Sequence, residues 1–260
     1  MRRISSFGLS VFILLAVMTG CTVKEERGAC PCRLFLDLMH VDIAAMSPLS
    51  IFVASEERIE HEAFLNAADI PDVYEAFVPR TELKVMGWSG GDGYASDKGL
   101  NIPLGYDCPP VYIHSSMLHA EGESVRDTVV LRKNHCVMRI RFIDPEGFSA
   151  MTVRGAVSGF DMHGNPKPGD FRYYCQVEDG APASTQVCLP RQTGDPLYLD
   201  VADMAGKVKT FPLREYIAAA GYDWSEPDLK DLSLTLNYTL TTVSLIVSGW
   251  DEEFVFDVVI

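Results

Sequence analysis

Hydrophobic and polar side chains alternate along much of this chain. The clearest run covers residues 232–241, where Leu and Tyr occupy the even positions and Ser, Thr and Asn the odd ones. Shorter runs with the same period cover residues 34–38 and 138–142. A strand with one face in a core and the other in water shows this period of two. The pattern predicts an all-β protein.

The other strand candidates are short and separated by clusters of Gly, Pro, Asn and Asp. They are 50–54, 82–88, 111–117, 128–132, 151–157, 172–177, 185–190, 197–201, 207–211, 243–247 and 254–260. Many short strands between turn signals are typical of antiparallel sandwiches rather than of an α/β sheet.

Helices are few in this prediction. Residues 213–220 follow Pro212 and precede Gly221, the residue types that favour a helix start and a helix end. Residues 57–67 are expected to form a second short helix.

The number of strands exceeds what one small sandwich needs, so we expect two tandem antiparallel β-sandwich domains. We divide the chain into a linker over 21–29, a first sandwich over 30–132 and a second over 133–260. No linker rich in Pro, Gly or Ser separates the two sandwiches, so a strand could run from one into the next. The halves show no convincing sequence repeat.

The first 20 residues are typical of a bacterial lipoprotein signal peptide. Arg2 and Arg3 precede an apolar stretch over 7–17 that is shorter than the about 20 residues of a spanning helix. Gly20 then stands directly before Cys21. We expect cleavage at this point and attachment of lipid, including palmitate, to Cys21. The alternative is a plain secretory peptide.

The residues after Cys21 suggest where the lipoprotein goes. Lys24, Glu25 and Glu26 resemble the export signal of Bacteroidetes surface lipoproteins, and the alternative is a solvated linker. We therefore expect a lipid-anchored protein of the outer membrane that faces the cell exterior.

Charge excludes one class of partner. The formal charge is −14, and it becomes −16 when Arg2 and Arg3 leave with the signal. Such a chain repels phosphate backbones, so we exclude nucleic acid as a partner. After the signal, no run is long and apolar enough to span a membrane.

Six cysteines remain beyond Cys21: Cys30, Cys32, Cys108, Cys136, Cys175 and Cys188. Export exposes them to an oxidising compartment, where six cysteines allow 15 full pairings. Cys175 and Cys188 are the expected disulfide because their strands could be neighbours. Some of the others could be buried thiols, and no paired Cys-x-x-Cys spacing indicates zinc.

Catalytic motifs are weak. Residues 87–91 fit G-x-S-x-G around Ser89, but the residues that follow carry no helical stripe, so a glycine-rich hairpin is the preferred interpretation. The histidines form no H-E-x-x-H motif, and His114 and His119 would face opposite sides of a strand. We expect no enzyme, no metal site and no cofactor.

Two further groups of residues each have a structural alternative. Asp92, Asp97 and Asp107 could touch calcium, but they do not match the spacing of a calcium loop. Four aromatic residues near loops could stack on sugars, although such residues more commonly pack a core. They are Trp88, Tyr94, Tyr222 and Trp224.

Four stretches in sequence order carry a family resemblance. Residues 30–37 (CPCRLFLD), 83–88 (LKVMGW), 135–142 (HCVMRIRF) and 243–250 (VSLIVSGW) together resemble the FimB-type fimbrial anchor family of Bacteroidetes. The resemblance covers nearly the whole chain after the signal.

This resemblance implies two transthyretin-like sandwiches and a structural, non-enzymatic role. Such a lipoprotein fixes a fimbria to the outer membrane through β-strand contacts, with fimbrial stalk or accessory subunits as partners. A surface glycan-binding lipoprotein of a polysaccharide-uptake system is the alternative, and a hydrolase would rest on Ser89 alone.

The last seven residues suggest a contact device. Phe254, Phe256, Val258 and Ile260 share one face of a predicted strand. That strand could be donated to a neighbouring subunit. The alternative, which we favour, is that it is the last strand of its own domain.

Overall fold

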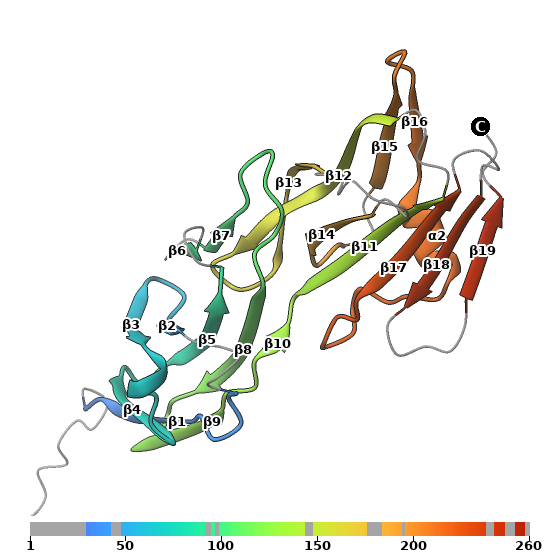
Figure 1. Ribbon diagram of the computed structural model, residues 1–260. Coiled ribbons are helices and arrows are strands. Elements are labelled where there is room, and N and C mark those ends of the chain that lie inside the picture. Colours follow the sequence, from blue (N-terminus) through green and yellow to red (C-terminus); the bar gives the residue numbers. More distant parts are fainter. Residues whose placement is uncertain are drawn as a thin grey trace, which may run out of the picture.

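Figure 1 shows the computed structural model of the chain, in which strands dominate and form two β-sandwiches end to end. This confirms the all-β prediction. The structure describes residues 30–42, 48–91, 95–96, 99–143, 148–175, 184–193, 196–237, 242–247 and 253–257.

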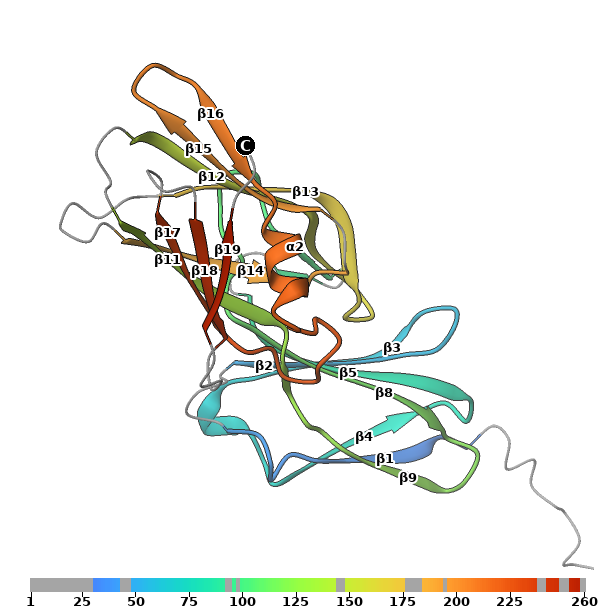
Figure 2. The same ribbon diagram turned by 90° about the vertical axis from the view of Figure 1, so that its right-hand side faces the viewer.

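The first sandwich packs a three-stranded sheet on a five-stranded one (Figure 2). The smaller sheet has the order β4 (Val73–Val78), β1 (Cys32–Asp37) and β9 (Ser124–Thr128). The larger has the order β10 (Arg132–Lys133), β8 (Val111–His119), β5 (Glu82–Gly90), β2 (Leu49–Ala54) and β3 (Ile59–Leu65). Alternate residues such as Leu34 and Ile51 are fully buried between the sheets.

The second sandwich is larger. One sheet has the order β14 (Ser184–Pro190), β11 (His135–Ile143), β17 (Leu232–Asn237), β18 (Thr242–Val247) and β19 (Glu253–Asp257). The other has the order β16 (Val208–Phe211), β15 (Leu197–Asp203), β12 (Phe148–Asp161), β7 (Gly99–Asn101) and β6 (Ala95–Ser96), and β13 (Pro166–Tyr174) also pairs with β12.

The helix expected over 213–220 is confirmed as α2 (Leu213–Ala219). Pro212 stands at its N-cap, and Gly221 after it has a φ of 76°, which only glycine adopts at little cost. Leu213, Tyr216 and Ile217 turn into the second core, so α2 packs on that core beside β19 (Figure 2).

Two ladders are parallel, which the sequence prediction of antiparallel sandwiches did not contain. They join β1 to β9 and β11 to β17. Each sandwich thus places its first long strand between an antiparallel neighbour, β4 or β14, and a parallel one, β9 or β17. Alternation in the sequence shows which face of a strand is buried, but it does not show whether neighbouring strands run parallel or antiparallel. This shared layout could therefore not be predicted from the sequence.

The helix expected over 57–67 is wrong. Residues 59–65 form β3, which pairs with β2, and Ala67–Asp69 form only one short 3-10 turn, η2. The alanines and glutamates of this stretch favour a helix locally, and pairing along the whole of β2 overrides that preference. The strand expected over 128–132 is also wrong, because the chain leaves β9 at Thr128 and crosses to the opposite sheet, where β10 begins at Arg132.

Two connections of the chain join the sandwiches. Only Asn134 separates β10 from β11, so the chain runs almost straight from the first sandwich into the second (Figure 1). In the reverse direction, β7 pairs with β12 of the second sandwich. Segment 99–108 therefore belongs with the second sandwich, whereas the division at residue 132 put it in the first.

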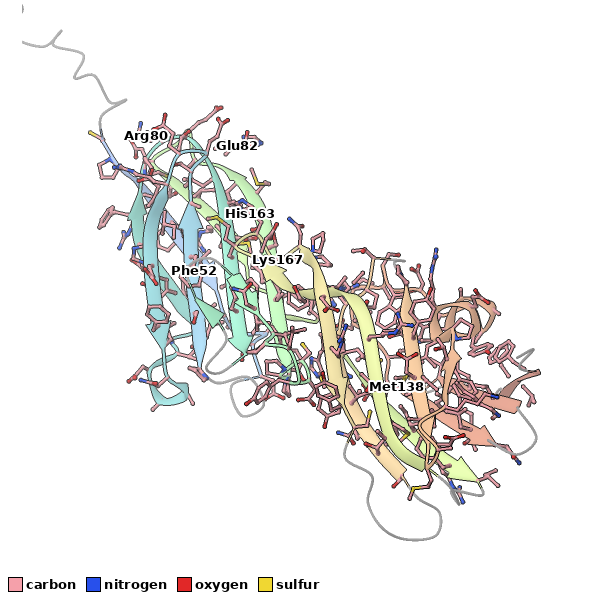
Figure 3. All side chains as sticks on the ribbon, turned by 90° about the horizontal axis from the view of Figure 1, so that it is seen from above. Phe52, Arg80, Glu82, Met138, His163 and Lys167 are labelled. Carbon is pink, nitrogen blue, oxygen red and sulfur yellow. The ribbon has the colours of Figure 1, made fainter. Side chains whose placement is uncertain are left out.

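The two sandwiches also share a core. Trp88 of β5 packs edge-on against Phe160 of β12, with ring centroids 6.3 Å apart. At the turn of the β12–β13 hairpin, Gly164 lies so close to β8 that an added Cβ would be 2.8 Å from a methyl of Ile113. The neighbouring His163 and Phe52 of β2 line one small hollow at this junction (Figure 3).

Candidate functional site at the strand edges

Ser89 is not placed as a catalytic nucleophile. It is 2% exposed and lies inside β5, opposite Leu49 on one side and Tyr112 on the other. The strand continues to Gly90, and the next described element is the strand β6 rather than a helix. A nucleophile elbow needs a sharp turn from strand to helix at the serine, so the motif here marks a strand end.

His114 takes part in hydrogen bonds that link the two sheets of the first sandwich. Its Nε2 lies 3.1 Å from Asp127 Oδ2, and its Nδ1 accepts the Val130 N–H at 3.2 Å. The Ser116 hydroxyl donates to the same carboxylate oxygen. Burial raises the pKa of Asp127, but these hydrogen bonds outweigh it and hold that pKa below its usual range. The Ser116 hydroxyl also lies 3.2 Å from His114 Nε2, so the three side chains form one polar cluster that joins β8 to β9.

Three of the four aromatic residues considered for sugar stacking are packed instead. Trp88 and Tyr222 are buried, and Trp224 packs against the second core with its ring 4.9 Å from that of Tyr222. Tyr94, Asp92 and Asp97 lie outside the described residues. Within the described ranges, no group of three or more His, Cys, Asp or Glu side chains could hold a metal ion.

The C-terminal strand completes its own sandwich. β19 is antiparallel to β18, with Phe254 opposite Leu245 and Phe256 opposite Val243. Both phenylalanines pack against the second core, and the ring of Phe256 lies 5.2 Å from that of Tyr216. Residues 253–257 thus form the last strand of their own domain, which is the alternative that the sequence analysis favoured. Val258 and Ile260 lie outside the described residues.

An open strand edge occurs instead in the first sandwich, at β9. Among the described strands, β9 pairs with β1 alone. The N–H of Arg33 donates to Glu123 O and the N–H of Val129 donates to Asp37 O, both at 2.9 Å. Backbone groups alternate in direction along a strand, so the odd-numbered residues of this segment bond to β1. The backbone groups of Ser124 and Arg126 therefore point to the open side.

The second sandwich shows what normally lies on that side. β17 holds the place of β9 beside the first long strand, and β18 pairs along its far side. Leu234 of β17 is 1% exposed, whereas Val125 of β9 is only partly buried against the first core. The first sandwich therefore lacks, among its described strands, the counterpart of β18.

The outer face beside this edge combines charge with an aromatic ring. The guanidinium groups of Arg33 and Arg126 lie 5.1 and 4.8 Å from the centre of the Phe35 ring. Arg33 also forms an ion pair with Glu75 at 2.6 Å. An open hollow of about 350 Å³ adjoins the edge and is lined by Phe35, Asp37, Val73, Arg126, Asp127 and Thr128.

The expected disulfide does not form between Cys175 and Cys188, which are both free thiols. Cys175 follows β13, where its N–H donates to Met151 O at 3.0 Å, and Cys188 lies in β14. These strands belong to different sheets, and the cysteine that meets Cys188 is Cys108. The sequence could not reveal this because Cys108 arrives on the crossing segment.

The remaining predicted site residues lie before the described part of the chain: Cys21, Lys24, Glu25 and Glu26. They stay predictions. Among the described residues, no helix has the length and apolar character needed to cross a bilayer.

The sequence was compared with protein-family models and with curated proteins, and neither comparison found a match. The fold did find matches. The fimbrial anchor protein Mfa2 from Porphyromonas gingivalis superimposes with a TM-score of 0.61 at 12% identity, over 85% of this chain and 98% of that chain. This chain has the fold of Mfa2.

Two candidate adhesins have the same fold. The one from Bacteroides ovatus matches with a TM-score of 0.60 at 10% identity, over 86% of this chain and 96% of its own. The one from Bacteroides thetaiotaomicron matches with a TM-score of 0.57 at 13% identity, over 85% and 97%. The fold implied by the resemblance in sequence is thereby confirmed.

Proposed function

We propose that this chain is a non-enzymatic, lipid-anchored protein of the outer membrane that attaches or assembles a fimbria at the cell surface. The observation that carries the proposal is the likeness to Mfa2, a protein named as a fimbrial anchor, over nearly the full length of both chains. The likeness includes both sandwiches, so the whole two-domain arrangement is shared.

The proposed contact site is the open edge of β9. A strand edge offers unpaired backbone donors and acceptors, and an extended segment of another protein can add to it. We propose that a fimbrial stalk or accessory subunit supplies that segment, running antiparallel to β9 as β18 runs antiparallel to β17. Apolar side chains at alternate positions would cover Val125, and neighbouring groups would meet the ring of Phe35.

The proposed membrane attachment uses Cys21. Several acyl chains hold a protein on a membrane, whereas one alone binds only marginally. Lys24, Glu25 and Glu26 would direct the lipoprotein to the outer face. The described residues begin at Cys30, so the linker leads directly into β1, beside the proposed contact edge.

The edge is tested by one substitution with a matched control. Arg126→Pro removes the backbone N–H that points to the open side, while the bonds to β1 stay intact, and an edge strand tolerates proline. Arg126→Ala removes the guanidinium but keeps the N–H. Each full-length variant is affinity-purified from detergent-solubilised outer membrane of its host, and co-purified fimbrial subunits are quantified.

We expect the unaltered chain and Arg126→Ala to retain fimbrial subunits, and Arg126→Pro to retain up to about tenfold fewer, as the loss of one backbone hydrogen bond predicts. Equal recovery with Arg126→Pro would rule out the β9 edge. Recovery of an outer-membrane sugar importer in place of fimbrial subunits would favour the glycan-binding alternative.

Membrane attachment is tested separately by Cys21→Ser. The variant should leave the membrane fraction and appear in the soluble fraction, because it has no site for lipid. If it stays in the membrane fraction, lipid on Cys21 is not the anchor, whatever the β9 result.

A further inference from the structure

The segment that crosses from the first sandwich onto the second ends at a pair of buried cysteines. After β7, the N–H of Ile102 donates to Ser158 O at 2.8 Å, and the N–H of Gly105 donates to Arg172 O at 2.7 Å. The N–H of Cys108 then donates to Cys188 O at 2.9 Å. The segment thus passes across β12 and β13 and reaches β14 at Cys188.

Cys108 and Cys188 meet inside the protein. Cys108 is 1% exposed and Cys188 6% exposed, and the neighbouring Cys188 thiol contributes to the raised pKa of Cys108. The Cys108 thiol donates to Pro109 O at 3.2 Å. The backbone hydrogen bond from Cys108 to Cys188 holds the two main chains side by side, as a disulfide with Cα atoms about 4.4–6.8 Å apart requires. Both thiols are free in the structure.

The other cysteines do not compete for this pairing. In the β11–β14 ladder, Cys188 stands opposite Val137 and Cys136 opposite Leu189. Cross-strand partners share a face and neighbours along a strand alternate, so Cys136 and Cys188 lie on opposite faces of the sheet. Cys136 lies beside Tyr222 instead, and burial raises its pKa to about 12.

We propose that Cys108 and Cys188 form a disulfide that fastens the crossing segment to β14. A disulfide-bearing oxidant, such as an exported thiol oxidase, accepts the electrons. One cysteine thiolate attacks the oxidant and releases one thiol, and the second thiolate attacks the resulting mixed disulfide and releases the other. Two electrons pass from the protein sulfurs to the oxidant, and the two protein protons end on the two released thiols.

The timing follows from burial. Burial raises the pKa of the Cys108 thiol well above its usual range, so the folded protein offers little thiolate for attack. The bond should therefore form during folding in an oxidising compartment. Formation in the cell rests on the proposed export, whereas formation in the test tube does not.

The test refolds the full chain from denaturant into buffer that contains glutathione disulfide. Unreacted thiols are then alkylated, and the protein is digested without reduction for mass spectrometry. We expect the peptides with Cys108 and Cys188 to be linked. Reductant should lower the Tm by about 5–15 °C, as a bond that closes a long loop predicts. Cys108→Ala should abolish this drop, and Cys136→Ala should keep it.

Alkylation of both Cys108 and Cys188 after oxidative refolding would overturn the proposal, as would a link from Cys188 to Cys175. Cys188→Ala is the control for a variant that merely folds poorly. Its Tm must be as insensitive to reductant as the Tm of Cys108→Ala. A link that forms on refolding but is absent from chain purified from its host would support the pairing and speak against the proposed export.

Discussion

The two sandwiches share a layout but finish it differently. In each, the first long strand lies between an antiparallel and a parallel neighbour. In the second sandwich the sheet continues past the parallel strand through β18 and β19, whereas in the first the described sheet stops at β9. A domain that closes its own sheet needs no partner, and a domain with an open edge can accept one. We therefore expect the second sandwich to be stable without a partner and the first to carry the proposed recognition site.

The largest expected effect comes from removing β19. Deleting residues 253–260 takes away Phe254 and Phe256, which pack on the second core, and should cost at least about 5 kcal/mol, much of the stability of a typical domain. Chemical unfolding followed by tryptophan fluorescence would measure the loss.

Val255→Ala is the control for that deletion, because Val255 is 66% exposed and its loss should change stability by no more than about 0.5 kcal/mol. A deletion variant with unchanged unfolding would reverse the assignment of β19 and revive its use as a donated strand.

A smaller effect compares the two equivalent strands directly. Leu234→Ala in β17 should cost about 3 kcal/mol, because its side chain is enclosed on all sides. Val125→Ala in β9 should cost about 1 kcal/mol or less, because the open edge leaves that side chain partly in water. Urea titrations of both variants measure the difference. Equal losses would mean that β9 is as well covered as β17.

The smallest expected effect concerns the junction and depends on pH. His135 is buried at the start of β11, and the N–H of Val111 in β8 donates to its Nδ1 at 3.1 Å. Burial lowers the pKa of His135 below its ordinary value of 6.5. The contact of Nδ1 with Val111 O at 3.1 Å and the nearby Asp231 oppose this, and Lys133 adds to it. The folded state thus binds fewer protons than the unfolded state.

The stability that His135 contributes is therefore present above about pH 6.5 and is lost as the pH falls through the folded pKa. One proton limits the slope to about 1.4 kcal/mol per pH unit. Unfolding measured at intervals from pH 8 to pH 5 should show this slope, and His135→Gln should flatten it. His119→Gln, at an exposed histidine, serves as the control and should keep it.

Several parts of the fold follow from the sequence, because local pattern determines them. The alternation over 34–38, 138–142 and 232–237 corresponds to β1, β11 and β17, and Pro212 and Gly221 bracket α2 correctly. Each of these signals depends only on which face is buried or on the preference of a single residue for a helix end.

The rest depends on partners far apart in the sequence. Period two does not say that β9 runs parallel to β1, or that β7 leaves the first sandwich for β12. The same limit hid the neighbour of Cys188, since Cys108 reaches it only through that crossing. Residues 59–65 became a strand because β2 offered a ladder, against the helical preference of their alanine and glutamates.

The position of β1 has a mechanical consequence. It is the first described strand of the chain and lies between β4 and β9, with six paired positions on one side and five on the other. A pull on the chain ahead of Cys32 acts along the strand, so it loads both ladders in shear and their hydrogen bonds must fail together. A pull across an edge strand would instead open its bonds one at a time. The first sandwich therefore resists tension applied from its N-terminal side in shear, the loading direction that needs the larger force.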